Sequence, residues 1–203
     1  MAWHVSEHCA QIDYVITSTP FGSPLAQGER QGAATIISIQ IGDVLEELAD
    51  VLICPANPWL NLSGGVNGAL LLRGGQSVQD ELHSFLTHTG RKAVEPGGVV
   101  QTGPGPLAVR WILHAVAIDP FYDSSVELVT RTLGSALEQA SQLGARTIVM
   151  PMLATGYGRL NTEEFGAALS SIREREWPDV ERLTVVVRKV DDAGTLHRLC
   201  GAH

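Results

Sequence analysis

Two glycine-containing segments follow apolar, β-branched runs, and their composition suits phosphate binding. The first is Ser63-Gly64-Gly65, directly before a run with a helical pattern, and the second is Thr155–Gly158, which reads TGYG. Glycine lets a backbone approach phosphate closely, and free N–H groups at a helix start attract anions. Neither segment is a P-loop or a GxGxxG fingerprint. Together they favour a two-sided clamp for a diphosphate, with an ordinary turn as the alternative at each.

Asp43 and Asn57 also follow predicted strands and could contact a ligand. An ionised carboxylate accepts a hydrogen bond from an exocyclic amine, and an amide can donate to and accept from ribose hydroxyls. Asp43 could equally be a turn acid, and Asn57 before Pro58 is also a common turn element. Trp59 in the same loop either packs against the core or lines a pocket.

Other candidates favour structural roles. His114 lies in an apolar strand and is interpreted as a satisfied core histidine. His4, His8 and Cys9 lack a fourth ligand at a sensible spacing and fit a solvated tail. The sequence therefore predicts neither a metal site nor a cofactor.

Alternating strands and helices must position these residues. The hydrophobic pattern predicts six strands, at Thr35–Ile41, Asp50–Cys54, Val99–Thr102, Trp111–Ile118, Thr147–Met152 and Leu183–Val190. Predicted helices cover Val66–Arg73, the stripe Val78 to Leu86, the stripe Leu128 to Leu143, a segment after an Asn161–Glu164 capping box, and Asp192–Leu199. Glu46–Asp50 is predicted to be a turn. The alternation indicates a largely parallel sheet sandwiched between helices.

Ligands of open α/β sheets bind beyond the carboxyl ends of the strands. That rule selects three segments, which are residues 42–44, 55–68 and 154–160. The clamp hypothesis therefore requires Asp43, Asn57 and Tyr157 to face one cleft.

Composition and charge limit the classes of binding partner that this chain can have. The chain has 203 residues, 44% of them hydrophobic, and a formal net charge of −8. Such an acidic surface argues against general nucleic-acid binding. No basic, apolar leader and no apolar run of membrane-spanning length is visible, so we expect a cytoplasmic protein away from membranes, with Cys9, Cys54 and Cys200 as free thiols.

The run from Cys54 to Ala69 resembles the macrodomain family, whose pattern is an "NAAN" strand end, a short loop, a glycine run and a "V-x-G-A" helix start. Gly42-Asp43, Trp111–Val116 and Pro151–Gly158 also fit. The resemblance covers about residues 35–190 and implies a three-layer α/β/α sandwich with a mixed, mostly parallel central sheet. Residues 34–203 would form the macrodomain. Residues 1–33 would be an N-terminal extension, in which Gln11–Thr17 has the pattern of one extra strand.

The family binds ADP-ribose, and the resemblance assigns roles residue by residue. Asp43 looks like the acceptor of the adenine amino group, with the Val44 N–H beside it, and Asn57 looks like the distal-ribose contact. Two further sets complete the predicted site, around the distal ribose and over the diphosphate respectively: Ser63, Gly64, Gly65, Val66 and Asn67, then Ala154, Thr155, Gly156, Tyr157 and Gly158.

The chain departs from the family at three places. Cys54 replaces the first asparagine of "NAAN", Ser63 replaces a glycine, and Asn67 replaces an aspartate of many deacylating members. The last change puts an aspartate-assisted water mechanism in doubt. Other active members lack that aspartate, and there the phosphate of the ligand is thought to position the attacking water.

Two functions are compatible with this resemblance. The leading hypothesis is a hydrolase or deacylase of an ADP-ribose conjugate, either a mono-ADP-ribosyl protein or O-acetyl-ADP-ribose, with Asn57, Gly65 and Tyr157 as catalytic residues. The alternative is a non-catalytic reader of ADP-ribose or ADP-ribosylated protein. A different nucleotide-processing α/β domain is a more distant third.

Overall fold

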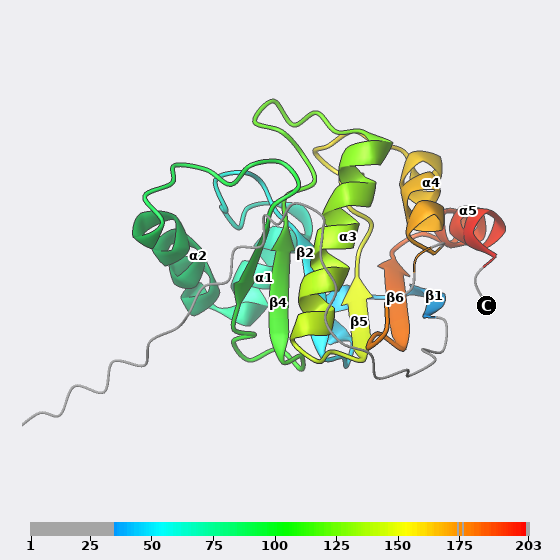
Figure 1. Cartoon of the computed structure of the whole chain (residues 1–203), viewed down its shortest axis with the longest axis horizontal. Helices are drawn as coiled ribbons and strands as arrows, with labels where there is room; N and C mark the ends of the chain where they lie inside the picture. The colour runs from blue at the N-terminus through cyan, green and yellow to red at the C-terminus, as the bar shows by residue number, and fades with distance from the viewer. Residues whose placement is uncertain (1–34, 174, 176, 202–203) are drawn as a thin grey trace, which may run out of the picture.

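The computed structural model describes residues 35–173, 175 and 177–201, and Figure 1 shows their arrangement. The predicted N-terminal extension, with its possible strand and its His4–Cys9 cluster, lies outside the described residues. The elements follow in the order β1 (Ile36–Ile41), η1 (Val44–Glu46), β2 (Val51–Pro55), α1 (Gly65–Gly74), α2 (Gln76–His88), β3 (Val99–Thr102), β4 (Trp111–Ala115), α3 (Val126–Gln142), β5 (Thr147–Met150), α4 (Thr162–Arg173), β6 (Arg182–Val187) and α5 (Val190–Cys200).

The six strands form one sheet in the order β1-β6-β5-β2-β4-β3. Four neighbouring pairs are parallel, and only β3 runs antiparallel, against β4 at the edge. Because β1, β2, β4, β5 and β6 run the same way, the loops that follow them gather at one edge of the sheet (Figure 1).

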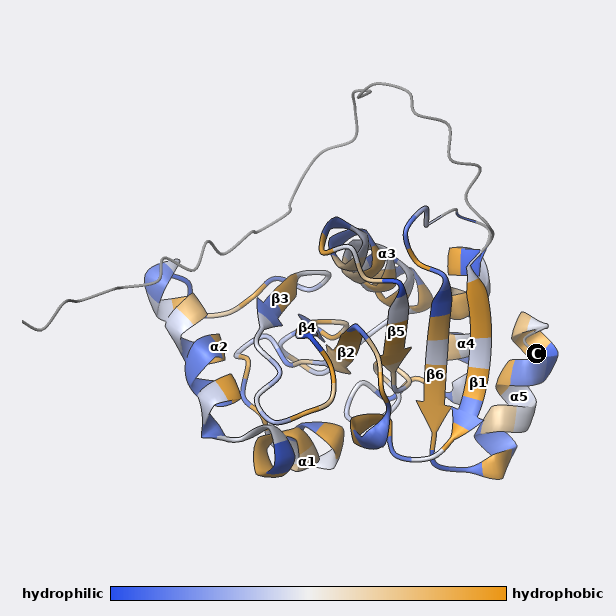
Figure 2. Cartoon of the chain, turned by 90° about the horizontal axis from the view of Figure 1, so that it is seen from below, coloured by the Kyte–Doolittle hydropathy of each residue, from blue (hydrophilic) through white to orange (hydrophobic). Residues whose placement is uncertain are grey.

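Successive strand residues alternate between two cores, as the pleat requires. In β2, Val51 and Ile53 belong to the core under α3, α4 and α5, whereas Leu52 and Cys54 belong to the core under η1, α1 and α2. In Figure 2, α3 lies on one side of the sheet and α1 on the other. The predicted three-layer α/β/α sandwich with a mixed, mostly parallel sheet is confirmed.

The helix ends follow local sequence signals. The Asn161 side chain accepts from Glu164 N and the Glu164 carboxylate accepts from Asn161 N, both at 2.8 Å, so the predicted capping box forms before α4. Gly144, two residues beyond the end of α3, has φ +66, the left-handed conformation expected at C′. None of the described helices is both long and apolar enough to cross a membrane.

Three strands end earlier than their apolar runs predict. Residues 116–118 are buried but lie beyond β4, and two of them, Ala117 and Ile118, form part of the wall of a cavity instead of extending the ladder. Pro151 follows the last residue of β5, and proline has no N–H for the ladder. β6 ends at Val187, and α5 already begins at Val190. At Val44–Glu46 the chain forms the short helix η1, just ahead of the turn predicted at Glu46–Asp50.

Candidate functional site

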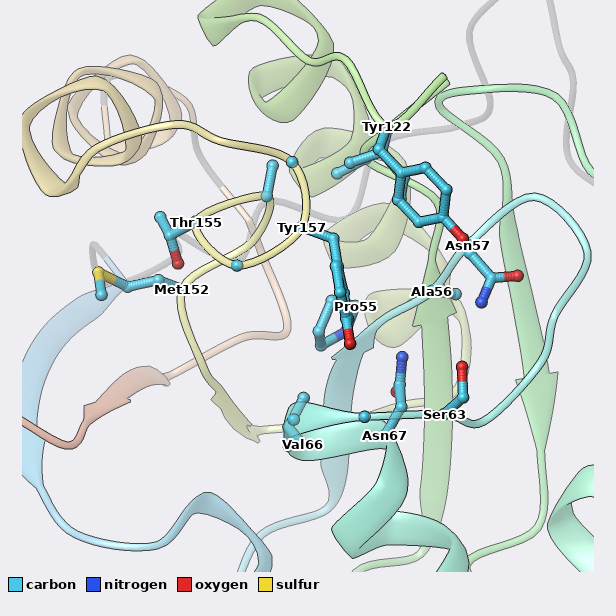
Figure 3. A pocket seen from close by; sticks show the side chains of 17 residues that line it. Pro55, Ala56, Asn57, Ser63, Val66, Asn67, Tyr122, Met152, Thr155 and Tyr157 are labelled. Atoms are coloured by element: carbon cyan, nitrogen blue, oxygen red, sulfur yellow. The ribbon is translucent and has the colours of Figure 1, made fainter. Parts of the chain in front are cut away.

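A cavity of about 690 Å³ opens where β2, β4 and β5 end. Its volume lies within the range of small-molecule sites, roughly 300–1,000 Å³. Its walls come from four segments (Figure 3), which contribute Pro55–Asn57, Ser63–Asn67, then Ala117, Ile118 and Tyr122, and finally Met152 and Ala154–Gly158. The cavity therefore lies at the sheet edge where the topology favours a ligand.

The structure brings most of the predicted site residues together. Asn57, the run from Ser63 to Asn67 and the run from Ala154 to Gly158 all line this cavity. Asp43 and Val44 do not line it, because they follow β1, which β6 separates from β5. Asn57 and Tyr157 thus share one cleft as the clamp hypothesis requires, whereas Asp43 lies at the same sheet edge but outside the cavity wall.

Asp43 forms ion pairs with two arginines, one on α1 and one just after β6. Its Oδ2 lies 2.8 Å from Nη2 of Arg73 on α1 and 3.1 Å from Nη2 of Arg188 beyond β6, and its Oδ1 accepts from Leu45 N at 3.1 Å. Partial burial raises the pKa of Asp43. The Leu45 N–H and the Arg188 and Arg73 charges outweigh burial and hold that pKa below its ordinary value. The carboxylate is therefore ionised at neutral pH, and the Val44 side chain beside it is buried.

The side chain of Asn57 folds the loop between β2 and α1. Its Nδ2 donates to Asn61 O at 2.8 Å, and its Oδ1 accepts from Trp59 N at 3.1 Å and Asn61 N at 3.2 Å. An amide oxygen has two lone pairs and its NH₂ has two hydrogens. Asn57 therefore keeps one hydrogen to donate to a ligand, but its accepting capacity is used within the loop, contrary to the two-way role that its residue type suggested.

Gln79 on α2 binds the backbone of the same loop. It is buried, and its side chain accepts from Leu62 N at 2.7 Å and donates to Leu60 O at 2.9 Å. It also contacts His83, which contacts Asn61 Oδ1. Sequence reasoning missed this residue, although a glutamine beside Val78 on the apolar face of a helix was a signal.

The glycines of the first turn allow a close approach of two loops. Gly64 and Gly65 have φ +64 and +50, and no side chain caps α1 at Gly64. A Cβ on Gly64 would lie 2.5 Å from Oη of Tyr157, so Tyr157 reaches across the cavity to this turn. The first N–H groups of a helix have no intrahelical partner. Main-chain donors at Gly65 and Val66 therefore border the cavity.

Cys54 and Asn67 form a pair beneath the cavity. The buried Cys54 thiol donates to Oδ1 of Asn67 at 3.3 Å, and burial raises the pKa of Cys54 to about 12. The thiol therefore keeps its proton at neutral pH. Figure 3 shows the Asn67 nitrogen pointing into the cavity, so this side chain presents a donor there.

Tyr122 is a cavity-lining residue that sequence reasoning missed. It lies in the loop after β4, and its ring centroid is 5.8 Å from that of Tyr157. The segments selected from the sequence, 42–44, 55–68 and 154–160, do not include the loop after the apolar strand Trp111–Ile118. That loop also follows the carboxyl end of a strand, which is the signal that points to Tyr122.

The cavity wall contains polar but uncharged side chains. Among the residues that the structure describes, no Asp, Glu, His, Cys, Lys or Arg lines it, and the side-chain donors are amides and hydroxyls of Asn57, Ser63, Asn67, Tyr122, Thr155 and Tyr157. An anion in this cavity would therefore be held by neutral hydrogen-bond donors. Within the described part of the chain, no cluster of three or more His, Cys, Asp or Glu residues could hold a metal ion.

His114 is structural but only partly satisfied. It is fully buried, its Nε2 lies 2.9 Å from Oγ1 of Thr102, and its Nδ1 has no hydrogen-bond partner among the residues that the structure describes. Thr102 donates its own hydroxyl proton to Gly103 O, so the Nε2–H donates to Thr102. Burial lowers the pKa of His114 to about 3, and the imidazole is neutral. The prediction of a core histidine is confirmed by its burial. The prediction that its hydrogen bonds are satisfied is wrong for Nδ1 within the described residues.

Known proteins share this architecture. The Macro domain family model matches residues 53–168, more than half of the chain. A macro domain-containing protein of Streptomyces nogalater is 34% identical over 128 residues, covering 62% of this chain and 70% of that protein. One of Streptomyces coelicolor is 32% identical over 128 residues, covering 62% and 75% respectively.

Solved structures agree in fold. A mutant Oceanobacillus iheyensis macrodomain with ADPR has a TM-score of 0.77 and 22% identity, covering 85% of this chain and 95% of that one. The Trypanosoma brucei macrodomain in complex with ADP-ribose has a TM-score of 0.70 and 21% identity, covering 80% and 68%. Since the family model spans the segments that build the cavity, from β2 to α4, this chain belongs to the Macro domain family.

Proposed function

We propose that this chain binds ADP-ribose, either free or as a conjugate, in the cavity at the ends of β2, β4 and β5. The observation that carries the proposal is the meeting of two glycine turns, at Gly64-Gly65 and Gly156–Gly158, across one cavity whose described wall has no charged side chain. Such turns present main-chain N–H groups to a diphosphate. The solved relatives with ADP-ribose or ADPR support the same ligand.

The ligand's groups can be matched to the donors and acceptors available. The diphosphate would lie between the two turns, and Asn57 and Asn67 would donate to hydroxyls of the distal ribose. Adenine would extend toward Asp43. That carboxylate has Leu45 N on Oδ1 and two guanidinium groups on Oδ2, which leaves one lone pair on Oδ1 for the adenine amino group.

Hydrolysis of an ADP-ribose conjugate is the activity we propose for this cavity. Water would add to C1″ of the distal ribose, the bond from C1″ to the attached group would break, and the water proton would pass to that leaving group. Because the residues described around the cavity supply neither a carboxylate nor an imidazole to its wall, a phosphate of the ligand would have to hold the water. Asn57, Gly65 and Tyr157 would orient the ribose.

A non-catalytic reader is the second candidate. The same lack of an ionised base in the cavity wall favours it, because positioned general acids and bases contribute about 10²–10⁴-fold to rates. A reader would bind ADP-ribose on a protein and leave the linkage intact.

One paired experiment tests binding and turnover separately. Calorimetric titration with ADP-ribose should give one site, and incubation with an auto-ADP-ribosylated protein should release label. Asn57→Ala, which opens the loop that Asn57 folds, should weaken both readouts. Binding without label release selects the reader. No heat with ADP-ribose overturns the proposed ligand, and unimpaired cleavage by Asn57→Ala overturns the catalytic role of Asn57.

A further inference from the structure

Three aromatic rings form a continuous row beside the cavity. Trp59, Tyr122 and Tyr157 come from three different loops, and adjacent ring centroids lie 6.2 and 5.8 Å apart with interplanar angles of 46° and 57°. Tyr122 and Tyr157 line the cavity, while 37% of Trp59 and 67% of Tyr157 are exposed. We call these three residues the aromatic row.

The backbone holds the middle ring of the aromatic row in an unfavourable conformation. Tyr122 has φ +65, which costs a non-glycine residue of order 1–3 kcal/mol. The Asp119 carboxylate fixes the turn by accepting from Phe121 N and Asp123 N, both at 2.8 Å. The backbone of Trp59 is also fixed, because its main-chain N–H donates to Oδ1 of Asn57. Strain retained beside a cavity indicates that the ring positions matter for a ligand.

The chemistry of the aromatic row suits a planar cation. Indole and phenol rings have electron-rich faces, which attract cations within about 6 Å of the ring centre. Within residues 35–173, 175 and 177–201, no cationic side chain lines the cavity to compete for these ring faces. The nearby Arg159 is paired with Asp123 at 3.3 Å.

The geometry points to the aromatic row as a subsite for a planar cationic group joined to C1″ of ADP-ribose, such as a pyridinium or an arginine guanidinium. The inference rests on the proposed function, which orients the distal ribose at Asn57. Trp59 lies two residues beyond Asn57 and donates its main-chain N–H to that side chain. A group leaving C1″ would therefore meet the row, whereas the diphosphate would not.

A charge-matched ligand pair tests this subsite. NAD⁺ carries a pyridinium on C1″, and NADH carries an uncharged ring of nearly the same size. We expect NAD⁺ to bind about three- to tenfold more tightly than NADH, the size of one partly exposed cation–π contact. Trp59→Leu should remove most of that ratio while leaving ADP-ribose affinity within about twofold. Phe121→Leu, an exposed aromatic outside the row, is the matched control.

The outcomes separate the two proposals. Equal affinity for NAD⁺ and NADH, or a ratio that persists in Trp59→Leu, overturns the subsite while ADP-ribose binding still stands. Loss of heat with ADP-ribose itself overturns the proposed function, and the subsite with it. A second arm titrates ADP-ribosylated agmatine, whose guanidinium is also planar. Of NAD⁺ and ADP-ribosylated agmatine, the compound with the larger gain in affinity over ADP-ribose identifies whether the subsite prefers a pyridinium or a guanidinium.

Discussion

The side chain of Asn67 has one defined orientation because its oxygen accepts from the Cys54 thiol. Cys54 and Asn67 are two of the positions at which the chain departs from the family pattern, and they pair with each other. The protonated thiol donates, and the Asn67 oxygen accepts. The amide nitrogen is left for the cavity (Figure 3). At this position the chain presents a donor that can bind a hydroxyl but cannot take a proton from water.

Replacing Asn67 by aspartate tests that reading. Asn67→Asp keeps an oxygen for the Cys54 thiol and places a carboxylate in the cavity. We expect label release from an ADP-ribosylated protein to rise about tenfold or more, because a positioned general base contributes roughly 10²–10⁴-fold. KM should also rise, since the carboxylate repels the diphosphate. Asn67→Ala is the control, and an aspartate variant no faster than this control contradicts the assignment.

At the scale of elements, the loops around the cavity hold their shape at a conformational cost. Among the residues that the structure describes, the non-glycine residues with positive φ are Leu60, Tyr122, Ala154 and Arg159, and all lie in the loops after β2, β4 and β5. Such strain persists only where surrounding contacts over-determine the backbone. In the last loop the contacts include Leu160 N donating to Ala154 O at 3.0 Å.

Gly158 closes that loop by packing on backbone. A Cβ there would lie 2.6 Å from Ala154 O and 2.7 Å from Cγ2 of Ile118, whereas a Cβ on Gly156 meets nothing within 4 Å. We expect Gly158→Ala to lower the free energy of unfolding by about 1–3 kcal/mol, as overpacking does, and to weaken ADP-ribose binding. The free energy of unfolding of Gly156→Ala should lie within about 0.5 kcal/mol of that of the parent. Urea titration measures both, and equal stability of the two variants refutes the packing argument.

For the whole molecule, the partly buried Asp50 ties two parallel strands of the sheet together where they begin. At the edge opposite the cavity, Oδ2 of Asp50 accepts from Arg146 N, Thr147 N and Thr147 Oγ1 at 2.9–3.1 Å, which joins the start of β2 to the start of β5. Partial burial raises the pKa of Asp50, and these hydrogen bonds reverse the shift and hold it below its ordinary value. His114 in β4 is the opposite case, because burial alone depresses its basicity.

The pH dependence of stability follows from His114. Its pKa falls from an ordinary 6.5 to about 3 on folding, so between these values the unfolded chain binds more protons. Stability is therefore lost as pH falls below about 6.5, by about 2 kcal/mol between pH 7.5 and pH 5. Urea midpoints across this range should show the loss in the parent. The His114→Gln variant should have a flatter profile, and an unchanged slope would exclude His114 as the cause.

The sequence by itself determined the layers and much of the cavity wall. Strands buried on both faces and amphipathic helices report burial through short-range patterns, and glycine turns at strand ends mark where a ligand can approach. The apolar run at residues 116–118 predicted a longer strand, because burial of Ala117 and Ile118 beside a cavity produces the same pattern as burial in a strand.

Only the tertiary structure decided how side chains share their hydrogen-bonding capacity. The Asn57 oxygen is used within its own loop, Asp43 is shared between Arg73 and Arg188, and Trp59 meets Tyr122 across two loops. These partners are distant in sequence or depend on the exact turn of the backbone. Residue types state what a group can bind, whereas the competition among neighbours that fixes what it does bind exists only once the chain is folded.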